Sequence, residues 1–73
     1  MKTTRIEKSV YAGEHGGVRF RVVGSHFDAD GRHTARIARW EYVVYLPGSP
    51  AQGVSQHKST ALDAVREIID FAG

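Results

Sequence analysis

Cysteine is absent from this 73-residue sequence, and so is any long apolar run. Without cysteine, neither disulfide bonds nor thiolate metal ligands can stabilise the fold, and a reducing compartment is favoured. The longest mainly apolar stretch, Trp40 to Leu46, is interrupted by Glu41. It is far shorter than the roughly 20 residues that a membrane-spanning helix needs. We therefore expect no membrane partner.

The N-terminal residues 1–7 also lack the apolar segment of a secretory signal peptide. We expect a soluble, cytoplasmic protein. A chain of this length has room for one domain, residues 1–73, with a small core and modest stability.

Charge is distributed unevenly along the chain. Residues 1–46 contain eight Lys and Arg against five Asp and Glu, whereas residues 47–73 contain two against three. The basic first part favours an anionic partner, although an ordinary solvated surface would explain the same numbers.

Two segments in the first part of the chain have the alternating pattern of β-strands. In the first, residues 5–11, Ile6 and Val10 share one face and Tyr11 takes the other. Glycine-rich residues 12–17 then predict a loop. From Val18 to Val22, valine and phenylalanine alternate with Arg19 and Arg21, and the strand is expected to continue to Phe27.

A hairpin turn is predicted at residues 28–31, with Gly31 in the left-handed conformation. A third strand should follow from Arg32 to Leu46. Its stronger apolar set is Trp40, Tyr42 and Val44, and a change of phase near residues 38–39 predicts a β-bulge. The prolines and glycines of residues 47–56 predict a mobile loop.

The last segment predicts a helix capped by Thr60. Its buried stripe is expected to consist of Leu62, Val65, Ile68, Ile69 and Ala72. The predicted fold is therefore α+β, a three-stranded antiparallel sheet of β-β-β-α order with one C-terminal helix packed on one face. One helix covers only one face, which leaves Tyr11, Arg19 and Arg21 on an open face.

Motifs for metal binding and catalysis are weak. His26 and His33 flank the predicted turn, but a cross-strand polar pair explains them, and a hairpin turn explains Asp28 and Asp30 better than a calcium loop. No phosphate-binding loop or nucleophile motif is present in the sequence. We expect no catalytic residue, no metal and no cofactor.

The remaining signal is a set of basic residues interleaved with aromatic ones, which can bind a protein surface or nucleic acid. The predicted binding residues are Tyr11, Arg19, Arg21, Arg36 and Arg39. The alternative is that the arginines are only solvated.

Three short strings, residues 17–21, 35–37 and 59–65, give the chain a layout that resembles AP2-type and phage-integrase arm-binding domains. This resemblance implies three strands followed by a helix, with the sheet in the DNA major groove. It also implies that Arg19, Arg21 and Arg36 contact DNA. The tryptophan-bearing second strand of that family is displaced in this chain, and the loop before the helix is long.

In style, a small cysteine-free chain without a catalytic motif is also similar to phage accessory proteins such as anti-CRISPRs. The leading hypothesis is therefore a non-enzymatic module that inhibits or modulates a host protein or nucleoprotein complex by stoichiometric binding. The alternative is a DNA-binding module that uses the same basic face. A homodimer is compatible with either hypothesis.

Overall fold

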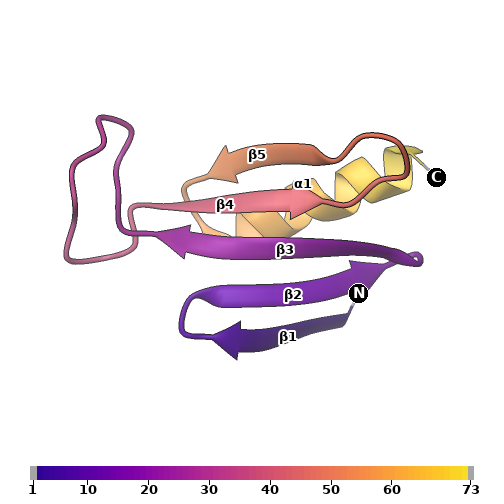
Figure 1. Cartoon of the computed structure of the whole chain (residues 1–73), viewed down its shortest axis with the longest axis horizontal. Helices are drawn as coiled ribbons and strands as arrows, with labels where there is room; N and C mark the ends of the chain where they lie inside the picture. The colour runs from indigo at the N-terminus through magenta and orange to yellow at the C-terminus, as the bar shows by residue number, and fades with distance from the viewer. Residues whose placement is uncertain (1, 73) are drawn as a thin grey trace.

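Five antiparallel strands and one helix make up the computed structural model, which describes residues 2–72. The strands are β1 (Lys2–Glu7), β2 (Val10–His15), β3 (Val18–Ser25), β4 (Arg39–Val44) and β5 (Ala51–Ser55). They lie side by side in chain order, and α1 (Lys58–Ala72) packs across one face (Figure 1). The predicted α+β class with one helix and an antiparallel sheet is confirmed, but the sheet has five strands instead of three.

The segment predicted as one strand over residues 5–11 is divided by a turn at Lys8 and Ser9. Ser9 has a φ of 68°, a left-handed conformation that few residues other than glycine adopt. The turn reverses the chain, so that β1 pairs with β2. The predicted loop over residues 12–17 is therefore mostly strand, and its reversal is confined to Gly16 and Gly17, both with positive φ.

The connection between β3 and β4 projects beyond one end of the sheet (Figure 1). Its turn at residues 28–31 is as predicted: Gly31 has a φ of 80°, and its N–H donates to the Asp28 carbonyl at 3.0 Å. Asp28 Oδ1 also accepts from the backbone N–H groups of Asp30 and Arg32, each at 2.9 Å. Hydrogen bonds accepted by Asp28 thus hold the turn.

The third strand is shorter than predicted, because residues 32–38 belong to this connection and β4 begins only at Arg39. The phase change near residues 38–39 therefore marks the start of the strand and not a bulge within it. The predicted facing set, Trp40, Tyr42 and Val44, does lie on the side of α1.

A fifth strand replaces the loop predicted over residues 47–56. Residues 51–55 pair with residues 40–44 of β4. Their inward positions are alanine, glycine and serine, and the Tyr42 side chain lies directly over Gly53, where a Cβ would collide with it. Small residues are needed here because an aromatic ring already fills the space.

The core lies between the sheet and α1. Its fully buried members are Phe20, Val22, Val44, Ala61, Val65 and Ile69. The predicted helix stripe is correct for Val65 and Ile69, whereas Ala72 is exposed. Thr60 is not the cap that the sequence suggested, because the helix begins at Lys58 and the first carbonyl to accept an intrahelical bond is that of His57.

Candidate functional site: the open face of the sheet

The face of the sheet opposite α1 is covered by no other element within residues 2–72 (Figure 1). We call it the open face. The strand register arranges its side chains in rows that cross the sheet. The central row consists of Thr4, Ala12, Arg21, Val43 and Gln52. The next row consists of Glu7, Val10, Val23, Glu41 and Val54.

Arg19 and Arg21 project from β3 onto this face, as the alternation of the strand predicted. Both are exposed, whereas Phe20 and Val22 beside them are buried under α1. The chain after β4 brings Tyr45 next to them, because its backbone N–H donates to the Arg19 carbonyl at 2.9 Å. The two arginines and the half-exposed tyrosine line one shallow depression with Ala12.

Charges of both signs alternate on the open face. Glu14 lies directly opposite Arg19 on one side and opposite Lys2 on the other. At the far end, Arg39 Nη2 is 3.6 Å from Glu41 Oε1. By register, four basic side chains therefore share the face with three acidic ones, and the field that it presents is mixed.

The prediction that Tyr11 lies on the open face is wrong. Tyr11 pairs with Val22 on the side of α1, its ring centroid is 6.1 Å from that of Trp40, and Lys58 Nζ lies 4.4 Å above it. The prediction assumed one strand, with Ile6 and Val10 on one face and Tyr11 on the other. The turn at residues 8–9 puts Ile6 and Val10 in different strands, so the alternation does not run through this segment. The aromatic ring of Tyr11 packs against the core instead.

The other two predicted residues belong to different elements. Arg36 lies in the β3–β4 connection, outside the sheet. Arg39 begins β4 on the open face, beside a pocket that includes Val54 and the turn residue Asp28. Its Nε is buried and has no hydrogen-bond partner among the described residues.

Of the five predicted residues, Arg19, Arg21 and Arg39 lie on the open face, with Arg39 at the opposite end of β3 from Arg19. Sequence reasoning missed several acidic and apolar members of the face. Among them are Glu41, Val43, Tyr45 and Val54. Alternation in β4 was a usable signal for Glu41 and Val43, which occupy the odd positions between its inward residues.

The two histidines of the β3–β4 connection do come together, as the predicted hairpin implied. The rings of His26 and His33 stack at a centroid distance of 5.9 Å, and the Phe27 ring meets His33 edge-on. Within residues 2–72, no group of three or more potential ligand side chains is arranged to hold a metal.

Comparison of the chain with protein families, with curated proteins and with solved structures finds no match. The resemblance to AP2-type and integrase arm-binding domains therefore stays a prediction. In residues 2–72 there is no helix long and apolar enough to span a lipid bilayer.

Proposed function

We propose that this chain is a non-enzymatic binding module that docks on a protein or nucleoprotein partner through its open face. It would act by occupying a surface of that partner, in the manner of small phage inhibitors, and not by turning over a substrate. The observation that carries the proposal is the composition of the face, in which arginines and a tyrosine alternate with valines and with carboxylates. Arginine and tyrosine are frequent hot-spot residues of protein interfaces.

The mixed sign of the face favours a protein over nucleic acid. A surface that follows a phosphate backbone gains from basic residues and loses from each carboxylate beside them. Glu14 and Glu41 lie next to Arg19 and Arg39, so two of the four cations are partly neutralised before any partner arrives. A protein surface with its own charges of both signs complements this pattern better.

Affinity capture from a lysate of the native host, with and without nuclease, tests the proposal. Wild-type chain should retain a protein partner after nuclease treatment. The Arg19→Glu/Arg21→Glu variant should lose at least about a hundredfold in affinity for that partner. Both side chains are exposed, so the variant should stay folded, with a slightly lower unfolding temperature because its carboxylate at residue 19 lies opposite Glu14.

Arg66→Glu is the matched control, because Arg66 lies on the exposed side of α1, where it pairs with Asp63 at 3.1 Å. This variant should capture the partner normally. Capture by the double variant at wild-type strength would show that the open face is not the docking surface.

Duplex DNA is the second candidate partner. It is favoured by one observation, that Lys2, Arg19, Arg21 and Arg39 share the open face. Four phosphate contacts should weaken binding about a hundredfold between about 50 and about 200 mM salt. Failure to bind a generic duplex even at low salt would eliminate this candidate and leave the protein partner.

A further inference from the structure

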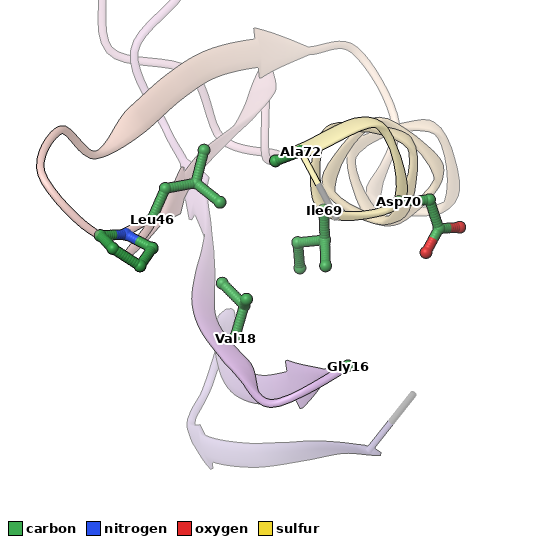
Figure 2. A pocket seen from close by; sticks show the side chains of 7 residues that line it. Gly16, Val18, Leu46, Ile69, Asp70 and Ala72 are labelled. Carbon is green, nitrogen blue, oxygen red and sulfur yellow. The ribbon is translucent and has the colours of Figure 1, made fainter.

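A second surface lies where the last turn of α1 approaches the end of β4, away from the open face. Two adjoining depressions meet there and share Leu46, Asp70 and Ala72. The inner one has a volume of about 390 Å³ and is bounded by Val18 and Ile69, which project toward each other from the sheet and the helix (Figure 2). The outer one extends past Ile68 to Phe71. We call the two together the helix-end groove.

The groove contains apolar surface that is not fully buried in the core of the fold. Phe71 is 96% exposed, by far the highest value among the exposed large hydrophobic residues within residues 2–72. Leu46 and Ile68, which lie next to it in the groove, are only half-buried. An exposed aromatic ring that continues into an apolar depression is typical of an interaction site, whereas a single exposed side chain is not.

The rim of the groove is negatively charged. Glu67 and Asp70 stand beside Phe71, and the C-terminal end of a helix carries a partial negative charge of its own. The last turn of α1 contains no basic residue to offset it. Asp70 Oδ1 is 2.8 Å from His15 Nε2, but Glu67 belongs to none of the ion pairs within residues 2–72.

The apolar surface and the negative rim together indicate which kind of partner the groove binds. A second copy of the chain placed groove to groove would bring like charges together, which is unfavourable. An anionic lipid or nucleic-acid surface would be repelled for the same reason. A peptide segment whose apolar side chains are flanked by lysine or arginine complements both the apolar surface of the groove and its negatively charged rim.

We propose that the helix-end groove binds a basic amphipathic segment of a protein partner. An apolar side chain of the segment packs beside Phe71, on Leu46 and Ile68. A lysine or arginine of the segment lies between Glu67 and the C-terminal end of α1. This is the helix-in-groove mode of peptide recognition, and it is independent of the open face.

The probe for a test is a 14-residue amphipathic peptide of leucine and lysine, with a counterpart in which glutamate replaces every lysine. Binding is followed by amide chemical shifts of the full chain. The lysine peptide should shift Val18, Leu46 and residues 67–72, and the glutamate peptide should not bind. Phe71→Ser should weaken binding at least about tenfold, and Glu67→Gln should weaken it and reduce its salt dependence.

The matched control is Phe27→Ser, because Phe27 is the other exposed phenylalanine and lies in the β3–β4 connection, outside the groove. This variant should bind the lysine peptide as wild type does. Val43→Thr, which alters the open face without changing its charge, should do the same and separates the groove from the open face. Equal binding of the two peptides, shifts confined to the open face, or no effect of Phe71→Ser would overturn the proposal. Concentration-dependent dimerisation that Phe71→Ser abolishes would assign the groove to a second copy instead.

Discussion

The two faces of the sheet differ most clearly at two neighbouring residues of β4. Val44 is fully buried beneath α1, whereas Val43, the residue before it, is only partly buried and lies on the open face. The same contrast repeats along β3, where Phe20 is buried and Arg21 is exposed. Successive side chains of a strand point to opposite faces, so a single strand serves the core and the solvent at once.

The contrast implies that stability and binding are separable in this domain. The side of α1 holds all six apolar residues that are buried within residues 2–72, and the open face holds alternating charges with aliphatic side chains between them. Substitutions on the side of α1 should therefore change the free energy of unfolding. Substitutions on the open face should change binding alone.

The largest effect is expected at Phe20. Its side chain is 1% exposed and lies at the centre of the core, so Phe20→Ala should destabilise the domain by about 3–5 kcal/mol. This is comparable with the whole stability of a small domain, and much of the variant should be unfolded at 37 °C. Urea unfolding followed by circular dichroism measures it. Arg21→Ala, one residue along on the other face, is the control and should change stability by less than about 0.5 kcal/mol.

A smaller effect is expected at Gly13, which tests how closely β2 approaches the core. A Cβ on this residue would collide with the Phe20 ring and with the Lys2 carbonyl. Although glycine-to-alanine changes in extended chain usually stabilise, Gly13→Ala should therefore destabilise by about 1–3 kcal/mol through overpacking. A gain in the midpoint of thermal unfolding would mean that the ring does not lie over this residue.

Gly13 also shows why the sequence predicted three strands and not five. Glycines at residues 13, 16 and 17 look alike in a sequence, and together they indicate one loop. In the structure, Gly16 and Gly17 form the turn, but Gly13 is a strand residue whose missing side chain makes room for Phe20. Only the partner ring across the sheet distinguishes the two uses of glycine, and local sequence does not contain it.

Local sequence was also insufficient to predict β5 and the face on which Tyr11 lies. Residues 51–55 have none of the large inward side chains that mark a strand, because Tyr42 and α1 fill that space from outside the segment. By contrast, alternation alone placed Arg19 and Arg21 correctly, since period 2 depends only on neighbouring residues. Tyr11 was assigned to the wrong face because its orientation depends on the turn at Ser9. The residue types at this turn do not indicate the positive φ of Ser9.

The smallest effect is expected at Val43, and it is best measured against Val44. Valine and threonine have similar shapes and both favour strands, so valine-to-threonine changes at these two residues differ mainly in where the hydroxyl goes. Val44→Thr places it in the core without a partner and should destabilise by about 1–3 kcal/mol. Val43→Thr leaves it in contact with water on the open face and should change stability by less than about 0.5 kcal/mol. Equal losses for the two variants in urea unfolding would mean that the open face is covered in solution, for example by a second copy of the chain, and the same pair measured at several protein concentrations would detect that copy.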